Sequence, residues 1–258
     1  DKILTLSSGT GGTVIGGGTY GYGTSANITA TPNTGYSFSG WSGAGVTDSS
    51  AANTTVNMTA DRSVSASFTL NNHTLSVSAG TGGTVSGGGT YGHGTNANIT
   101  ATPSTGYSFN GWSGTGVTDT SAASTTVSMT SDRSVSASFS LNNYTLSLGA
   151  GTGGTVSGGG TYGHGTNANI TATPSTGYSF NGWSGTGVTD TSAASTTVSM
   201  TSDQSVSASF SLNNYTLSLS SGTGGTVIGG GTYGHGTNAN ITATPSTGYS
   251  FNGWSGTG

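Results

Sequence analysis

Apolar and polar residues alternate over short stretches of this chain, and glycine-rich turns interrupt the alternation. In residues 2–7, Leu4 and Leu6 fall on one face and polar residues on the other, as in a half-buried β-strand. The same two-residue period predicts five further strands, over 13–15, 26–31, 36–38, 54–59 and 64–68. No segment has the three- and four-residue apolar spacing of an amphipathic helix. The chain is therefore predicted to be all-β.

The whole pattern repeats along the chain. Residues 35–43 read Gly-Tyr-Ser-Phe-Ser-Gly-Trp-Ser-Gly, and close copies of this stretch return every 71 residues, each with one tryptophan. Such regular self-similarity indicates a tandem array of one small module. With the first repeat set at Asp1, three repeats are complete and a fourth lacks its last strands: 1–71, 72–142, 143–213 and 214–258. No flexible linker separates neighbouring repeats, so we expect limited bending between them.

Each repeat is predicted to close around its tryptophan. Gly40 shifts the alternation by one position, as a β-bulge would, and this turns Trp41 toward the core. The expected core of the first repeat is Leu4, Leu6, Val14, Ile28, Ala30, Tyr36, Phe38, Trp41, Val56, Met58, Val64, Ala66 and Phe68. The same aromatic core motif is expected in the other repeats: Tyr107, Phe109 and Trp112; Tyr178, Phe180 and Trp183; Tyr249, Phe251 and Trp254.

Glycine and loop positions complete the predicted repeat of five or six strands. Three consecutive glycines at 16–18 indicate a bulge, a bend or a close approach of two backbones. Residues 19–24 are expected to form a loop or an irregular edge, and residues 42–53 a polar loop anchored by Val46.

Composition excludes several classes of function. Three basic residues face seven acidic ones, all aspartates, which leaves no basic patch for nucleic acid. No apolar run is long enough to insert in a membrane as a helix. Because the chain has no cysteine, no disulfide can stabilise a module of this size. The regular alternation argues against disorder, despite the excess of Gly, Ser, Thr and Asn.

Aspartate and histidine are the candidate metal ligands. One aspartate follows each tryptophan (Asp48, Asp119, Asp190), and another lies in a tight turn (Asp61, Asp132, Asp203). Calcium needs six or more oxygen ligands, so one carboxylate per loop favours turn chemistry instead. Tyr22 of the first repeat is replaced by His93, His164 and His235, each between two glycines, which is more typical of an exposed loop residue than of a metal ligand. We therefore predict no metal and no cofactor.

Other candidate sites remain as alternatives. No Ser-His-Asp set and no paired carboxylates stand out, so the protein is not expected to be an enzyme. Aromatic residues can form a platform for surface glycans, and the candidates in the glycine-rich loop are Tyr20, Tyr91, Tyr162 and Tyr233. Asn-x-Thr sequons offer candidate glycosylation sites at Asn27, Asn98, Asn169 and Asn240, although such matches also arise by chance in a chain rich in Thr and Asn.

The order of motifs in each repeat resembles a known family. Gly-Gly-Thr-Val, Thr-Ala-Thr-Pro, Gly-Tyr-Ser-Phe-x-Gly-Trp-Ser-Gly and Ser-Val-Ser-Ala-Ser-Phe follow one another as in the divergent internalin B-type B-repeat of bacterial cell-surface proteins. The resemblance covers the whole chain and implies a small β-grasp-like module between a wall-attached end and a working end. It implies no catalytic residues. The chain departs from the better-known internalin repeats in having almost no charge, so it carries over no charge-dependent ligand.

These observations favour a structural role outside the cell. Residues 72–142 and 143–213 differ at only four pairs of positions: His73/Tyr144, Val77/Leu148, Ser78/Gly149 and Arg133/Gln204. Such repetition gives reach, so we expect a non-catalytic stalk or spacer of a bacterial surface protein, whose partners are its neighbouring repeats. One alternative is a filament in which identical chains complete one another by strand addition. A further alternative is a carbohydrate-binding module.

Overall fold

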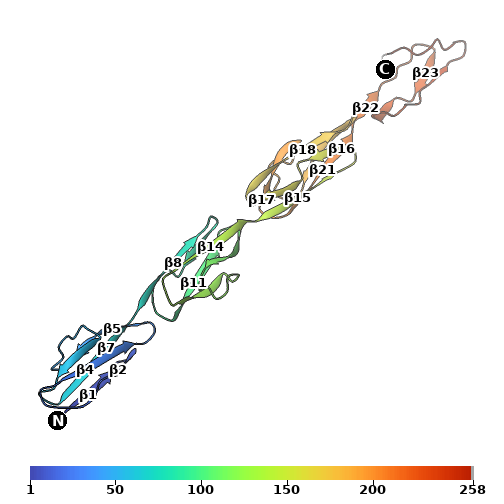
Figure 1. Cartoon of the computed structure of the whole chain (residues 1–258). Helices are drawn as coiled ribbons and strands as arrows, with labels where there is room; N and C mark the ends of the chain where they lie inside the picture. Colours follow the sequence, from blue (N-terminus) through green and yellow to red (C-terminus); the bar gives the residue numbers. More distant parts are fainter. Residues whose placement is uncertain (257–258) are drawn as a thin grey trace. The chain divides into compact units, whose positions relative to one another are not determined.

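The structure is a computed structural model that describes residues 1–256. The chain is divided into two compact units: unit 1, Asp1–Ser140, and unit 2, Leu141–Gly258. Figure 1 shows the chain coloured by sequence, with repeats 1 and 2 in unit 1 and repeats 3 and 4 in unit 2. All regular elements in residues 1–256 are β-strands, so the predicted all-β class is confirmed.

Repeat 1 has seven strands in two sheets. One sheet has the order β3-β1-β7-β5, and the other has the order β2-β4-β6. β1 and β7 are neighbours and run parallel, whereas all other pairs in this repeat are antiparallel. The strands are β1 (Lys2–Ser8), β2 (Gly12–Ile15), β3 (Gly18–Tyr20), β4 (Ser25–Pro32), β5 (Tyr36–Ser42), β6 (Asn53–Asn57) and β7 (Arg62–Leu70).

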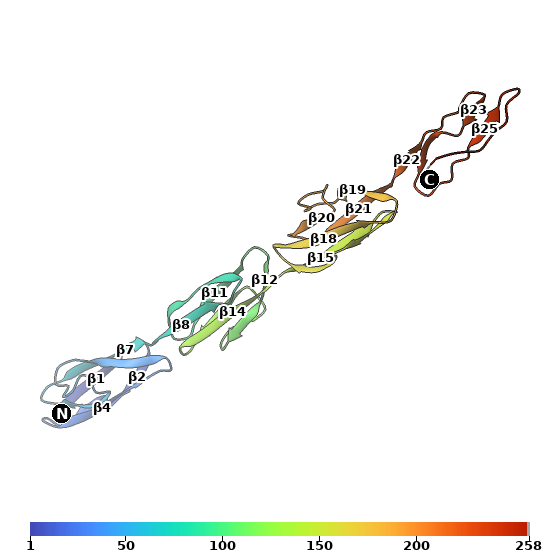
Figure 2. The same ribbon diagram turned by 90° about the horizontal axis from the view of Figure 1, so that it is seen from above.

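Repeats 2 and 3 have the same two sheets, as Figure 2 shows from a second direction. The strands of repeat 2 are β8 (Asn72–Ala79), β9 (Gly83–Ser86), β10 (Gly89–Gly92), β11 (Thr95–Pro103), β12 (Tyr107–Gly114), β13 (Ser124–Met129) and β14 (Arg133–Leu141). Those of repeat 3 are β15 (Asn143–Ala150), β16 (Gly154–Ser157), β17 (Gly160–Gly163), β18 (Thr166–Pro174), β19 (Tyr178–Ser184), β20 (Ser195–Met200) and β21 (Gln204–Leu212).

The core of each complete repeat lies between the two sheets. The expected bulge is confirmed, because the register of β5 against β7 shifts between Phe38 and Gly40. The shift turns Trp41 inward, where it is 5% exposed and its indole N–H donates to the Ala51 carbonyl at 3.1 Å. The buried cluster around it is Leu4, Ala26, Ile28, Ala30, Val56, Met58, Val64 and Ala66, with Leu6, Val14, Phe38 and Phe68 partly buried against it.

One prediction for the repeat was wrong, and another had left two outcomes open. Residues 18–20 form β3, an edge strand paired with β1, where a loop or an irregular edge was expected. The core position predicted for Tyr36 is wrong. Tyr36 is half-buried and lies outside the buried cluster, because its ring covers Gly11 at the β1–β2 turn, where a Cβ would overlap it. Tyr107 and Tyr178 cover Gly82 and Gly153 in the same way.

Repeat 4 contains two separate two-stranded sheets in the described residues. β22 (Asn214–Leu217) pairs with β24 (Gly231–Gly234), and β23 (Gly225–Ile228) pairs with β25 (Thr242–Pro245). The predicted core role of Tyr249, Phe251 and Trp254 is wrong for this structure: they are 59%, 49% and 43% exposed. Residues 214–256 hold no counterparts of the two strands that cover these aromatic side chains in repeats 1–3.

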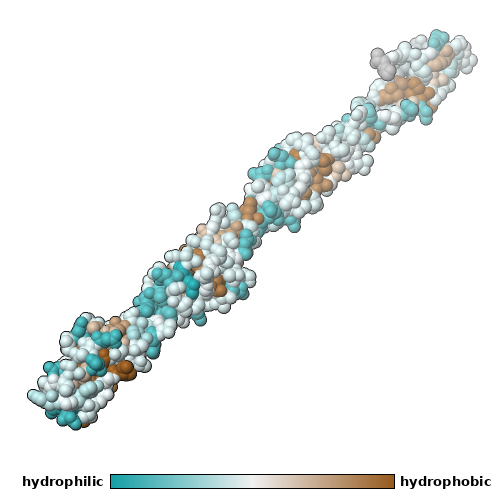
Figure 3. All heavy atoms as spheres, viewed as in Figure 1, coloured by the Kyte–Doolittle hydropathy of each residue, from teal (hydrophilic) through white to brown (hydrophobic). Residues whose placement is uncertain are grey.

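The surfaces of the two units are close to neutral in hydropathy. Most atoms in Figure 3 are pale, and brown apolar patches are small and scattered. The outward side chains of β5 and β7 are short and hydroxylated, and include Ser37, Ser39, Ser63 and Ser67. No polar or charged residue of the part described is buried.

Candidate functional site: the repeat junction and its histidines

A single residue, Asn71, connects the last strand of repeat 1 to the first strand of repeat 2. Its backbone N–H donates to the Gly35 carbonyl at 2.8 Å, and its own carbonyl accepts the His93 N–H at 2.8 Å. Gly35 has a φ of +82° and lies under the His93 ring, where a Cβ would overlap the imidazole. The Gly35 turn of one repeat therefore binds the β10–β11 turn of the next.

Repeats 3 and 4 meet through the same contacts within unit 2. The Asn213 N–H donates to the Gly177 carbonyl and the His235 N–H donates to the Asn213 carbonyl, each at 2.8 Å. Gly177 again lies under the ring of His235. The sequence pattern predicted that the histidines are exposed loop residues. This is right for His235, whereas His93 and His164 are half-buried.

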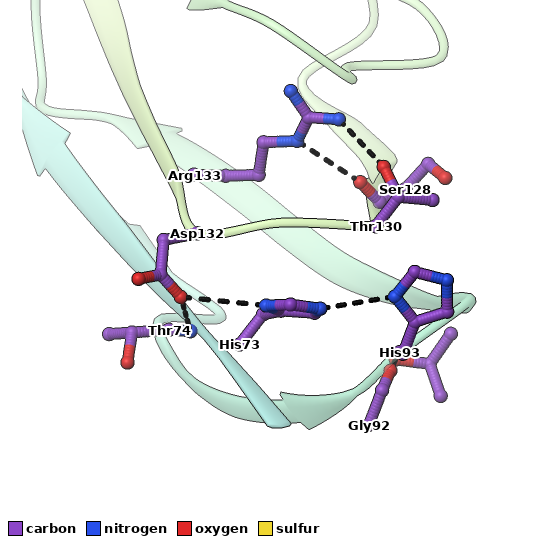
Figure 4. Close-up of polar contacts among 9 residues, drawn as sticks. His73, Thr74, Gly92, His93, Ser128, Thr130, Asp132 and Arg133 are labelled. Atoms are coloured by element: carbon purple, nitrogen blue, oxygen red, sulfur yellow. Dashed lines mark hydrogen bonds and ion pairs between the residues drawn. The ribbon is translucent and has the colours of Figure 1, made fainter. Parts of the chain in front are cut away.

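Repeat 2 contains a histidine pair, drawn in Figure 4. Nε2 of His73 lies 3.1 Å from Nδ1 of His93, and Nδ1 of His73 lies 3.8 Å from a carboxylate oxygen of Asp132. One ring nitrogen must donate and the other accept, so this hydrogen bond holds a single proton between the rings. The bond can therefore form only when at least one of the two imidazole rings carries a single proton.

Repeats 3 and 4 replace this pair with an aromatic contact. Tyr144 packs edge-on against His164, and Tyr215 is tilted against His235, each with ring centroids 5.9 Å apart. Throughout residues 1–256, no group of three or more His, Cys, Asp or Glu side chains is arranged to hold a metal ion. The sequence pattern did not predict the pair because His73 is on β8 and His93 is in the β10–β11 turn, 20 residues further along the chain.

The two sets of aspartates have different structural roles. Asp48 accepts hydrogen bonds from the backbone N–H and hydroxyl of Ser50, at 2.8 and 2.6 Å, as in an Asx turn. Asp119 and Asp190 make the same bonds with Ser121 and Ser192. Asp61 instead accepts the Ile3 N–H at 2.9 Å, and so ties the start of β1 to the turn before β7. Asp132 and Asp203 do the same for Thr74 and Thr145.

The Asx turns predict how stability depends on pH. The Ser50 hydroxyl first, and then its backbone N–H, lower the pKa of Asp48 below its usual value, and the pKa values of Asp119 and Asp190 are shifted alike. A carboxylate whose pKa is lower in the folded state than in the unfolded state, where it is about 3.9, stabilises the fold at pH values above about 3.9. This stabilisation is lost as the pH falls through the pKa of the folded state. We therefore expect the melting temperature to decrease as the pH is lowered below about 4.

A triple variant provides the control for this pH dependence. Asp48→Asn, Asp119→Asn and Asp190→Asn remove the three carboxylates but leave the other aspartates in place. Circular dichroism melts from pH 2 to 7 should show a shallower decline for the variant. An equal decline in the two proteins would contradict the assignment.

The tyrosines of the candidate glycan platform are used inside the repeats. The Tyr20 hydroxyl donates to the Gly16 carbonyl at 2.8 Å, and its half-buried ring packs against the core. Tyr91, Tyr162 and Tyr233 make the same bond to Gly87, Gly158 and Gly229. These contacts explain the tyrosines as structural residues, and a role in glycan binding stays a prediction. The sequon residues Asn27, Asn98, Asn169 and Asn240 are all exposed, and their glycosylation also stays a prediction.

The fold and the junction together define the class of protein. It is a tandem array of small all-β modules in which the same contacts recur between neighbouring modules. The family model of the divergent InlB B-repeat domain matches residues 3–72, 73–143, 144–214 and 215–258. The chain belongs to this family, which confirms the resemblance noted in its sequence. A search of curated proteins found no match.

Membership of this family sets a coarse functional class. Repeats of this kind are typical of bacterial surface proteins, and the family is a repeat domain rather than a known class of enzyme. Within the described residues, no helix has the length and apolar character needed to span a membrane.

Proposed function

We propose that this chain is a non-catalytic structural region of an extracellular bacterial surface protein, where it acts as a stalk or spacer. The observation that carries the proposal is the junction itself. Asn71 alone joins β7 to β8, and its backbone bonds to Gly35 and His93 hold repeat 1 against repeat 2. Modules that each have their own core and a repeated junction can be added in series without any change in the module.

The proposal predicts that length grows with copy number. Deletion of residues 72–142 removes one whole repeat and leaves Asn71 followed by Asn143, which keeps the Asn-Asn pair at the new junction. A compact module of this size should add about 25–35 Å to the chain. Small-angle X-ray scattering should therefore show a maximum dimension shorter by about this amount in the deletion variant. An unchanged maximum dimension, or a compact globule for the full chain, would overturn the stalk.

A filament is the second candidate, and the exposed surface of repeat 4 favours it. Phe251 and Trp254 line an open hollow of about 330 Å³ together with Leu219 and Val227. In repeat 3 the counterparts of the two aromatic side chains are covered by the packing of β20 and β21. A continuation of the same chain would supply two such strands, and so would a second copy of the chain.

The same scattering experiment separates the two candidates. A filament predicts a mass that rises with protein concentration, and a synthetic peptide of residues 195–212, which spans β20 and β21, should suppress the rise by occupying the hollow. A peptide in which Val198 and Val206 are replaced by Asp is the matched control. A mass equal to one chain at every concentration would contradict the filament.

A further inference from the structure

The first and last strands of each complete repeat are hydrogen-bonded directly to one another. β1 and β7 pair in parallel from Leu4↔Arg62 to Ser8↔Ala66. β8 and β14 have the same register, and so do β15 and β21, with Leu146 opposite Gln204 and Ala150 opposite Ala208. The strand by which the polypeptide enters a repeat thus lies beside the strand by which it leaves.

We propose that this parallel pair is a mechanical clamp, which keeps each complete repeat folded when the chain is stretched from its two ends. Tension pulls the start of β1 one way and the end of β7 the other. Because the two strands are parallel, this tension pulls them past each other along their length. All hydrogen bonds between the two strands then share the force and must break together. This inference rests on the proposed stalk, because only a tethered spacer would carry such a load.

Neighbouring contacts strengthen the pair where the load is greatest. β1 and β7 are the two inner strands of their sheet, with β3 and β5 on either side. Leu4, Val64 and Ala66 are buried on the core face, so water has little access to exchange with the ladder there. Asp61 bonds the Ile3 N–H at one end, and the Gly9 N–H donates to the Ala66 carbonyl at 2.9 Å at the other.

Other strand pairs of the repeat open differently under force. β2 and β4 are antiparallel, and Gly12↔Pro32 is the terminal pair of their ladder. Force applied at Thr10 and Asn33, just outside that pair, separates the ladder one pair at a time from that end. The same folded repeat should therefore be strong in one direction and weak in the other.

Single-molecule force spectroscopy on the full chain tests this direction dependence. The chain has no cysteine, so handles can be attached at chosen pairs of introduced thiols. Asp1→Cys with Asn72→Cys loads the clamp, and Thr10→Cys with Asn33→Cys loads the β2–β4 pair. Forced unfolding is governed by the unfolding rate, so both variants are compared at one loading rate. We expect a rupture force several-fold higher for the first pair. The chain released has an extended length of about 240 Å for the first pair and about 80 Å for the second, and the length gain is smaller by the distance between the handles in the folded repeat.

Two measurements keep the outcome unambiguous. Both variants should have the wild-type melting temperature, because the handles lie at exposed positions outside the core. Asp61→Ala, which removes the bond at the start of β1, should shorten the lifetime under end-to-end load more than under load at Thr10 and Asn33. Equal rupture forces in the two directions would overturn the clamp. A compact particle in scattering would overturn the stalk but leave the direction dependence unaffected, so the two failures can be told apart.

Discussion

Replacement of Trp112 by alanine is expected to unfold repeat 2 under conditions in which repeats 1 and 3 stay folded. The indole is 5% exposed, contacts Phe109 with ring centroids 5.8 Å apart, and donates its N–H to the Ala122 carbonyl at 3.1 Å. Removal of a buried tryptophan costs about 3–5 kcal/mol. At about 0.05–0.15 kcal/mol per residue, a whole repeat has a stability of about 4–10 kcal/mol. The loss is therefore a large fraction of what holds this repeat together.

Calorimetry measures the effect. For a module of this size, each kcal/mol lowers the melting temperature by about 4–8 °C, so the transition of repeat 2 should fall by about 12 °C or more. Trp254→Ala is the matched control. Both tryptophans end the same sequence, Gly-Tyr-Ser-Phe-Asn-Gly-Trp, but Trp254 is 43% exposed. Its replacement should cost no more than about 0.5 kcal/mol. Three unshifted transitions in Trp112→Ala would contradict the core assignment.

Gly87→Ala is the second substitution with a large expected effect. Gly87 has a φ of +102°, and a Cβ there would overlap the Asn98 carbonyl and lie 2.9 Å from the α-carbon of Ile99. The positive φ costs about 1–3 kcal/mol in a residue with a side chain. Displacement of the β11 backbone adds about 1–3 kcal/mol more. We expect repeat 2 to lose about 2–6 kcal/mol of unfolding free energy, which combines these two costs.

Gly94→Ala separates the two contributions. Gly94 has a φ of +80°, but nothing lies within 4 Å of the position that its Cβ would occupy. Its replacement should cost only the backbone strain of about 1–2 kcal/mol. Urea denaturation should place the midpoint of Gly87→Ala clearly below that of Gly94→Ala. Equal midpoints would mean that the backbones at Gly87 and Asn98 do not approach as closely as the structure has them.

Local features of the repeat could be predicted from the sequence because they depend on local periodicity. The alternation around Ile28 and Val64 identified strands and their inward faces, and Gly40 identified the bulge that buries Trp41. For the glycine run at 16–18 the sequence left three alternatives, and the structure shows one of them, a close approach of two backbones, since a Cβ at Gly16 would overlap the Asn27 carbonyl.

Features that depend on pairing between distant strands were missed. β3 begins at the last residue of a glycine run and has too few residues to show a period, so only its register with β1 defines it as a strand. Likewise, nothing in the alternation of β1 and β7 indicates that they pair in parallel. The His73–His93 contact likewise depends on strand pairing, here between β8 and β10. Tyr91 of β10 lies opposite His73 of β8, and this places the turn that follows β10, which contains His93, beside His73.

The near absence of charge at the surface has a consequence for the environments that the protein tolerates. In residues 1–256 the one contact between a basic side chain and a carboxylate is the His73–Asp132 contact at 3.8 Å. Arg62 and Arg133 donate to backbone carbonyls and hydroxyls instead. At low and moderate concentrations, dissolved salt acts on proteins largely by screening charges, and here it has very few to screen. Over that range of ionic strength the stability of the fold and of its junctions should therefore change little.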